Sequence, residues 1–343
     1  MGKHKATITD IARALQVTPS TVSRALNNHP RISEATRKKV LRVAHELNYQ
    51  PNGLAAALRK GHNPVIGVVV PTINRAFFSN VIFGIEQVAK AANYSVIITQ
   101  SNDSEAEEAR ALRTLAQAQV AGMLVSMARN TQNTDHFQRV LDDGIPLLLY
   151  DRVLDALPVN TVALDDRLGA YKAVSHLIEQ GCRRIAHFSG PAHLNIYRDR
   201  MRGYRDALED HGLAYDPSFI RVNDMQQTGG RASIREMWEE GIAIDAVFSS
   251  SDLAALGAMQ WLKEQGIAVP HQVALVGFAN EPLTDLVEPG LSSVEQHSQQ
   301  MGELAAQVFL EQLQNPEKFL KRPPHRTVIN PLLIVRGSSC RQE

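Results

Sequence analysis

Several large classes of protein are excluded by what the sequence lacks. It has only two cysteines in 343 residues, and they form no CxxC motif, which fits a reducing cytoplasm and argues against a disulfide framework or a zinc site. No apolar run approaches the roughly 18 residues of a membrane span, and the opening residues MGKHKATITD have no apolar core of a secretory signal. We therefore expect a cytoplasmic protein with no membrane partner.

Common catalytic motifs are absent as well. The sequence has no GxGxxG, GxxxxGKS/T or GxSxG pattern. Its 12 histidines are scattered and include no HxxxH pair. We therefore expect no catalytic residue, no cofactor and no metal ion, and a sugar-modifying enzyme is the least favoured function.

Charge is distributed unevenly although the formal net charge is zero. Residues 1–62 hold eleven Lys/Arg and three Asp/Glu, a balance of +8, which leaves 25 basic and 33 acidic residues for the rest of the chain. A small basic segment on an acidic body indicates a polyanion-binding module attached to a part with another task. A basic tail that is merely solvated is the alternative.

The basic segment has the pattern of three short helices. Thr7 and Asp10 are spaced as a capping box at the start of the first helix. Thr18 is a good N-cap for the second, and Pro19 follows it in the first helical position, where its missing N–H costs nothing. Ser33 caps a third. This arrangement predicts a helix-turn-helix domain.

The second helix lies in PSTVSRALNN and is polar on one side and apolar on the other. In a helix-turn-helix unit the first residues of the second helix meet base edges in the major groove. Arginine can bond bidentately to guanine, and serine can donate to or accept from bases of either kind. The polar side is therefore expected to face DNA. The DNA-binding residues expected in this domain are Thr7, Thr18, Pro19, Ser20, Thr21, Ser23, Arg24 and Asn27.

The stretch TITDIARALQVTPSTVSRALNNHPRISEATRKKVLRVAHELNYQPN resembles the head of the lactose/galactose-repressor (LacI/GalR) family of bacterial transcription regulators, and the resemblance covers the whole chain. From Asn52 to Arg59 the sequence could form two helical turns, which are too few to be stable without DNA and a partner chain. The resemblance implies that Leu58 enters the minor groove at the operator centre and kinks it. Asn52, Leu58 and Arg59 thus join the expected DNA-binding residues, and Gly53 should make the free hinge less helical.

A homodimer on a near-palindromic double-stranded operator is also implied, because two heads must be paired to read two half-sites. The family pairs its bodies through helices of the first lobe. Here the helix from about 78 to 92 contains Val81 and Ile85, which are candidates for that interface unless they belong to the core. VINPLLIVR is the last expected strand, and after it the sequence has no leucine heptad of the kind that joins some relatives into tetramers.

From Val65 onward, apolar runs alternate with helical patterns. This alternation predicts parallel sheets covered by helices on both faces. Nine strands exceed the needs of one small sheet, so we predict two doubly wound lobes, and the resemblance implies a periplasmic-binding-protein-like body. The predicted strands are VIGVVV, SVIIT, GMLVS, PLLL, TVAL, RIAHF, FIRV, DAVFS and VALVGF.

The resemblance implies three crossovers between these lobes, near residues 164, 292 and 327. The chain is therefore expected to have three parts: a helix-turn-helix domain (1–50), a hinge helix and linker (51–63), and an effector-binding and dimerisation body (64–343). Within the body, the first lobe is expected to take about 64–163 and 293–326, and the second about 164–292 and 327–343.

Ligands of open α/β sheets bind at the carboxyl ends of the strands, so the effector is expected in the cleft between the lobes. The resemblance implies that Arg200 makes a paired hydrogen bond with the effector and that aromatics near Phe77 and Phe78 cover its flat face. One of the two phenylalanines could instead be core, and Asp151 could instead brace a loop. The expected effector-binding residues are Phe77, Phe78, Asn102, Asp151, Arg200, Ser251, Asn280 and Gln296.

Two positions depart from the family pattern. Relatives usually carry an aspartate at the position of Ala279, in GFANEP, that accepts hydrogen bonds from ligand hydroxyls. Met225 stands where a cleft aromatic is common. Without that carboxylate, Arg200, together with Arg75 or Arg152, favours a sugar acid or phosphorylated sugar over a neutral sugar. Asn280 or Glu281 could substitute for the aspartate, and in the alternative Asn280 does its work for a neutral sugar.

Together these features predict a sequence-specific DNA-binding transcription regulator, a repressor, whose operator affinity is controlled by a small effector, a sugar or sugar acid. The alternative is an extracytoplasmic solute-binding protein, which shares the fold of the body. The helix-turn-helix head and the missing secretory signal disfavour it.

Overall fold

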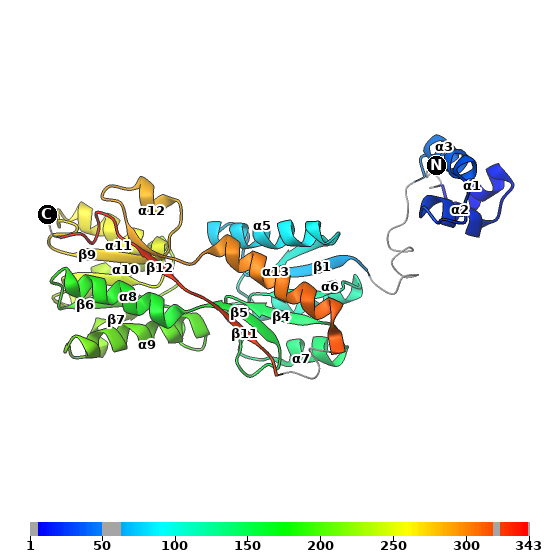
Figure 1. The fold of residues 1–343 in the computed structure, drawn as a ribbon. Helices are drawn as coiled ribbons and strands as arrows, with labels where there is room; N and C mark the ends of the chain where they lie inside the picture. Colours follow the sequence, from blue (N-terminus) through cyan, green and yellow to red (C-terminus); the bar gives the residue numbers. More distant parts are fainter. Residues whose placement is uncertain (1–5, 50–62, 318–322, 342–343) are drawn as a thin grey trace. The chain divides into compact units, whose positions relative to one another are not determined.

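The chain divides into two compact units, Met1–Asn63 and Pro64–Glu343, called the head and the body below. The expected hinge residues Asn52, Leu58 and Arg59 lie outside the described residues. No helix of the described ranges is long and apolar enough to cross a membrane. The structure, a computed structural model (Figure 1), describes residues 6–49, 63–317 and 323–341.

Local capping fixes where the helices of the head begin. At the first helix, the Thr7 hydroxyl accepts from the Asp10 amide while the Asp10 carboxylate accepts from the Thr7 amide. At the second, the Thr18 hydroxyl accepts from the Thr21 amide, and Pro19 occupies the first turn. The predicted helices are thereby confirmed as α1 (Ile8–Leu15), α2 (Pro19–Leu26) and α3 (Glu34–Glu46).

These three helices pack around a small apolar core. Ile11, Val22 and Val40, one from each helix, are fully buried. Burying an aliphatic side chain of this size stabilises a fold by about 1.5–3 kcal/mol, so the core fixes which side of α2 turns inward. The opposite side of α2 stays exposed at Ser20 and Arg24.

The first lobe of the body contains the strands β1 (Val65–Val70), β2 (Ser95–Gln100), β3 (Gly122–Val125), β4 (Leu147–Tyr150), β5 (Asn160–Leu164) and β11 (Arg326–Ile329). They form one parallel sheet in the order β11-β5-β4-β3-β1-β2. One face packs against α5 (Ala76–Ala91) and α13 (Ser298–Gln314), and the other against α6 (Glu105–Gln117) and α7 (Asp135–Asp142). Two helical layers explain why most of these strands are continuous apolar runs.

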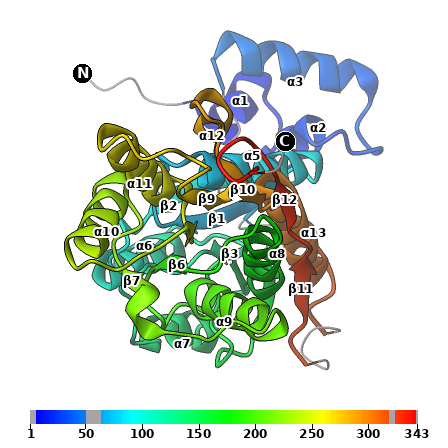
Figure 2. The same ribbon diagram turned by 90° about the vertical axis from the view of Figure 1, so that its left-hand side faces the viewer.

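The second lobe contains β6 (Ile185–Ser189), β7 (Ile220–Val222), β8 (Ala246–Ser249), β9 (Ala274–Ala279), β10 (Ser292–Glu295) and β12 (Leu332–Ile334). Their order is β12-β10-β9-β8-β6-β7, parallel except that β12 runs antiparallel to β10. Figure 2 shows α10 (Gln227–Glu239) and α11 (Asp252–Glu264) on one side of this sheet and α8 (Asp166–Glu179) on the other. The other helical elements of this lobe are α9 (Asn195–Asp210), α12 (Leu283–Leu286) and the 3-10 helix η1 (Pro217–Phe219).

The chain passes between the lobes after β5, after β10 and between β11 and β12. The expected crossovers near 292 and 327 were therefore placed too early. Residues of β10 pair with β9 in the second sheet, while β11 pairs with β5 in the first. VINPLLIVR, expected as one strand, is divided at Asn330 and Pro331, because a proline has no N–H to donate to a strand ladder.

Helices α5 and α13 cross at glycines. A Cβ at Gly84 would lie 2.2 Å from the Gln299 carbonyl oxygen, and one at Gly302 would lie 2.0 Å from the Val81 carbonyl oxygen. The two backbones therefore touch, and Val81 and Ile85 are fully buried. Both were candidates for the dimer interface; the structure assigns them to the core instead.

Several exposed apolar side chains of the first lobe lie on α5 and on β2, and others are Ile73 and Val328. Phe83 is 51% exposed, and Ile97 and Ile98 are 40% and 45% exposed. β2 is an edge strand of its sheet, and exposed apolar residues on an edge strand favour association with another chain. A homodimer formed through the first lobe would cover this surface.

Replacing Ile98 by aspartate should therefore weaken self-association, because the charge would have to be buried in the contact. Light scattering at micromolar protein should give a dimer mass for the wild type and a monomer mass for I98D. Val222→Asp is the matched control, because Val222 is 69% exposed on β7, an edge strand of the second sheet. A dimer that survives I98D but not V222D would place the interface on the other lobe.

Candidate effector cleft and DNA-contact surface

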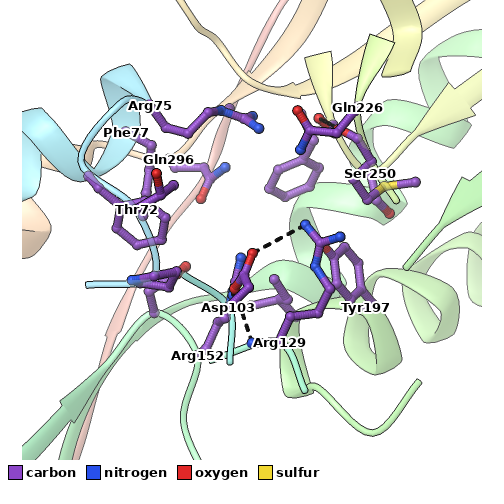
Figure 3. A pocket seen from close by; sticks show the side chains of 18 of the residues that line it. Thr72, Arg75, Phe77, Asp103, Arg129, Arg152, Tyr197, Gln226, Ser250 and Gln296 are labelled. Carbon is purple, nitrogen blue, oxygen red and sulfur yellow. Dashed lines mark hydrogen bonds and ion pairs between the residues drawn. The ribbon is translucent and has the colours of Figure 1, made fainter. Parts of the chain in front are cut away.

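A cavity of about 340 Å³ lies between the two lobes of the body. Both sheets contribute the loops and helix starts that follow their strands. This agrees with the rule, called the strand-end rule below, that ligands of open α/β sheets bind at the carboxyl ends of the strands. Figure 3 shows side chains from both lobes directed toward one space. Seven of the eight expected effector-binding residues line it: Phe77, Phe78, Asn102, Asp151, Arg200, Ser251 and Gln296.

Left-handed backbone places several of these groups. Asn102 (φ 51°) follows β2, and Asp151 (φ 59°) follows β4. Asparagine and aspartate tolerate this conformation better than most residues. Among the described residues, neither Asn102 nor Gln296 uses its side-chain amide in an internal hydrogen bond, so both amides can serve a polar ligand.

The aromatic side chains Phe77 and Phe78 sit at the start of α5. Their rings lie edge to face, 5.0 Å between centroids and at 81°. Both line the cavity and both are buried, so contact with the cavity does not distinguish the expected ligand-covering ring from the expected core ring. Met225 is also buried in the lining, where a flexible thioether can adapt its shape.

Arg200 is held by a buried ion pair. Its Nε and Nη2 lie 2.8 and 2.7 Å from Oδ1 of Asp166, and Nη1 donates to the Ser250 carbonyl oxygen at 2.8 Å. The guanidinium also stacks over the Phe278 ring, 3.6 Å from its centroid. One N–H on each of Nη1 and Nη2 remains for a ligand. The internal contacts therefore orient the guanidinium and still leave two donors for the ligand.

The buried carboxyls beside Arg200 have raised pKa values. Burial raises the pKa of Asp166 to about 7, against the opposing effect of Arg200. Burial likewise raises the pKa of Asp151, whose carboxylate accepts one hydrogen bond from the Ser126 hydroxyl at 3.2 Å. A carboxyl that takes up a proton can donate a hydrogen bond to a ligand oxygen.

A cluster of Asp103, Arg129 and Arg152 lies on one side of the cavity (Figure 3). Nη1 of Arg152 is 2.5 Å from Oδ1 of Asp103, and Nη2 of Arg129 is 3.4 Å from Oδ2. Burial alone would raise the pKa of Asp103, but the two guanidiniums hold it below its usual value. Asp103 is therefore charged at neutral pH and neutralises one of its two partners.

An ion pair joins the two lobes at the cavity wall. Nη2 and Nε of Arg75, before α5, lie 2.6 and 2.9 Å from Oε1 of Glu281, after β9. The Glu281 amide donates to the buried Asp252 carboxylate at 2.8 Å. The pair fixes Glu281 as the acidic side chain that this loop presents to the cavity.

Asn280 does not line the cavity, contrary to expectation. Its Nδ2 donates to Glu295 at 2.7 Å, and its Oδ1 accepts from Nη2 of Arg336 at 2.9 Å. Left-handed backbone at Ala279 (φ 129°) and Asn280 (φ 50°) turns the chain at this point. The Ala279 methyl and Glu281 line the cavity instead, so Asn280 does not replace the family aspartate.

Several lining residues are outside the expected effector-binding set, although Arg152 and Glu281 were named as alternatives beside it. Arg129 follows β3 by four residues and Arg152 follows Asp151, so both satisfy the strand-end rule. Tyr197 precedes Arg200 by one turn of α9, and its i, i+3 spacing was the available signal. Gln226 and Glu281 lie in loops that carry no periodic pattern. All five line the cavity.

In the head, α2 presents the expected DNA-binding side chains. Thr18, Pro19, Ser20 and Asn27 are exposed, as is Arg24. The Thr18 hydroxyl is shared among the Thr21 amide and the hydroxyls of Ser20 and Thr21, and Thr7 serves the α1 capping box. The ion pairs within the described head are Arg13–Asp10, Arg37–Glu34 and Arg42–Glu46, so none occupies Arg24.

Two family models match the chain: "Bacterial regulatory proteins, lacI family" over residues 7–52 and "Periplasmic binding protein-like domain" over residues 174–339. The ribose operon repressor of Haemophilus influenzae is 30% identical over 334 residues, which cover 97% of this chain and 98% of that protein. The chain belongs to the LacI family of bacterial regulatory proteins. Similarity along nearly the whole length therefore includes both the head and the body.

Other LacI-family relatives support the same assignment. The HTH-type transcriptional regulator GalR of Escherichia coli (strain K12) is 32% identical over 333 residues, 97% of this chain and 95% of that protein. The structure titled "transcriptional regulator CelR-cellobiose complex" has a TM-score of 0.74 at 29% identity and covers 97% of this chain and 100% of that chain. The chain is thus a DNA-binding transcription regulator, and the solute-binding alternative is not favoured.

Replacing Asp166 by asparagine should change how stability depends on pH. The folded-state pKa of about 7 exceeds the unfolded value of about 3.9. The folded state therefore keeps this proton where the unfolded chain has lost it, and the resulting stabilisation, complete below pH 4, is lost as pH rises to 7. Relative to D166N, the wild-type free energy of unfolding should fall by about 1.4 kcal/mol per pH unit between pH 5 and 7.

Urea unfolding at pH 5, 6, 7 and 8 measures this difference. Asp103→Asn is the control: the folded-state pKa of Asp103 is lowered, so its stabilisation is complete above pH 4 and lost only below. The difference between wild type and D103N should be constant from pH 5 to 8. Parallel curves for wild type and D166N would contradict the raised pKa.

Proposed function

We propose that this LacI-family chain is a repressor that binds a near-palindromic operator as a homodimer in the cytoplasm, and that a small polyhydroxylated ligand in the body cavity controls its affinity for that operator. It acts without catalysing a reaction. The observation that carries this proposal is the convergence of aromatic, amide and guanidinium groups from both lobes on one cavity of about 340 Å³. The ribose operon repressor and the CelR–cellobiose complex, named for a pentose and for a disaccharide, support a sugar-like ligand.

The proposal assigns the ligand contacts by chemistry. The rings of Phe77 and Phe78 suit the apolar face of a sugar ring. The free amides of Asn102 and Gln296 suit its hydroxyls, and Arg200 donates its remaining N–H groups. Asp151 and Ser251 complete the set from opposite lobes.

Operator capture tests the function as a whole. The full-length protein is incubated with fragments of the genome that encodes it, and bound fragments are recovered and sequenced. Recovery of one near-palindromic motif supports a regulator. Uniform recovery of all fragments, together with tight sugar binding, would favour a solute-binding protein.

Replacing Arg24 by alanine should lower the affinity for the recovered operator by about 1–3 kcal/mol and relax base preference at one position of each half-site. Arg24 is exposed on α2 and has no ion-pair partner among the described residues. Fluorescence anisotropy on the operator and on single-base variants measures both effects. Arg13→Ala, which removes an exposed charge from α1, should leave base preference unchanged. Equal losses on operator and random DNA for R24A would argue against base reading.

Arg200→Ala should abolish ligand binding, because it removes the buried guanidinium and leaves Asp166 without its partner. Calorimetry with the ligand that releases the operator measures the effect. Arg202→Ala, which removes a guanidinium 58% exposed on the same helix, should bind normally. An R200A protein that still binds ligand and still releases DNA would show that the ligand binds elsewhere.

A further inference from the structure

The cavity wall carries four guanidiniums and three carboxylates. Two of the guanidiniums have a carboxylate each: Arg75 is paired with Glu281, and Arg200 with Asp166 behind the wall. The lining groups that carry charge are Arg75, Arg129, Arg152, Arg200, Asp103, Asp151 and Glu281. The local charge of the cavity wall therefore depends on how the remaining two arginines and two aspartates are arranged.

Arg129 and Arg152 share one carboxylate, that of Asp103. This corner of the cavity therefore holds two positive charges and one negative charge. Asp151 is the remaining lining carboxylate; it accepts a hydrogen bond from the Ser126 hydroxyl, and burial raises its pKa against the opposing effects of Arg152 and Arg200. At the end of β9 the lining residue is Ala279, so no carboxylate from that position opposes a negative ligand.

The Arg152 guanidinium also has N–H groups that make no hydrogen bond among the described residues. Its side chain is 9% exposed. Among the described residues it donates only through Nη1, to Asp103 and to the Met127 carbonyl oxygen. Its Nε is buried without a partner, as is Nε of Arg129. Nitrogen atoms this buried cannot reach a ligand, so the donors left for an anionic acceptor are the two N–H groups on Nη2 of Arg152, which make no hydrogen bond among the described residues.

We propose that the ligand of the cavity carries a carboxylate or phosphate group, and that this group binds at Arg152 and Arg129 while the rest of the ligand occupies the space toward Arg200 and Gln296. This inference rests on the proposed ligand-controlled function and names the chemical class of the ligand. Phe78 supports it, since the Arg152 guanidinium carbon lies 5.9 Å from the centroid of that ring and is held in place beside the cavity.

Matched pairs of compounds test the ligand class. Calorimetry on the full-length protein at constant ionic strength compares glucose with gluconate, glucuronate and glucose 6-phosphate, and ribose with ribonate and ribose 5-phosphate. Inorganic phosphate tests the anion site alone. We expect at least one acid or phosphate to bind more tightly than its neutral counterpart; the two arms distinguish a carboxylate from a phosphate ligand.

Two substitutions of opposite expected sign test the site. Arg152→Gln removes the charge and should weaken binding of the anionic compound by about 10- to 100-fold, the range for hydrogen bonds to charged groups. Asp103→Asn keeps the oxygen that accepts from the Arg129 amide but removes the competing negative charge, so it should strengthen binding. A gain of affinity cannot result from misfolding.

Arg167→Gln is the matched control, because that arginine forms an exposed pair with Asp206 outside the cavity. It should bind the anion as the wild type does. Operator binding without ligand should be unchanged in R167Q, and thermal unfolding verifies that all three variants are folded.

Three results would overturn the inference. They are tighter binding of the neutral sugar than of its acids and phosphates, unchanged anion affinity in both R152Q and D103N, and no binding of any anion in the panel. Operator capture and release by a neutral sugar would still support the proposed function in each case, so the two failures are distinguishable.

Discussion

The three passages of the chain between the two sheets are the constraint on which the rest of the body depends. Because the chain leaves the first lobe after β5, returns after β10 and leaves again after β11, neither lobe can be completed without the other. The carboxyl ends of strands from both sheets consequently border one space. Residues as distant in sequence as Arg75 and Glu281 meet there at 2.6 Å. A cleft built in this way responds to any ligand with contacts from both lobes at once.

Charge balance in that cleft follows from burial as much as from composition. Asp103 keeps its charge because two guanidiniums face it, while Asp151 and Asp166, enclosed by protein, have raised pKa values. Arginines cannot respond in the same manner, because a guanidinium stays protonated at any pH that proteins meet. The buried carboxyls can therefore lose their charge and the arginines beside them cannot. This asymmetry favours ligands with acceptor groups over ligands with donor groups.

The sequence predicted best what is set locally. The helix starts of the head depend on a cap and the residues within one turn of it, as at Thr7 and Thr18, and most of the buried strands are predominantly apolar. The strand-end rule, together with the family resemblance that implied Arg200 and the two phenylalanines, also found seven cavity residues, because a parallel sheet brings all its carboxyl ends together. It failed at Asn280, where left-handed backbone redirects a single side chain toward Arg336, 56 positions away.

Helix periodicity has a related limit. It identifies the apolar side of α5 but not its neighbour, and α13, which buries Val81 and Ile85, begins more than 200 residues later. The crossover positions were predicted a few residues too early for the same reason. Only its pairing with β9 assigns Ser292–Glu295 to the second lobe, and only its pairing with β5 assigns Arg326–Ile329 to the first. Long-range pairing was thus the information that the sequence patterns did not contain.

Arg129 connects the charge of the cavity to the contact between the lobes. Its Nη1 donates to the Asp224 carbonyl oxygen at 2.9 Å, and its own carbonyl oxygen lies 2.6 Å from Nε2 of His193. Both partners belong to the second lobe, whereas Arg129 and its acidic partner Asp103 belong to the first. A ligand that draws this guanidinium toward itself must weaken or realign the bond to Asp224. The group best placed to hold an anion is therefore also one of the groups that join the lobes, so binding there acts directly on the contact between them.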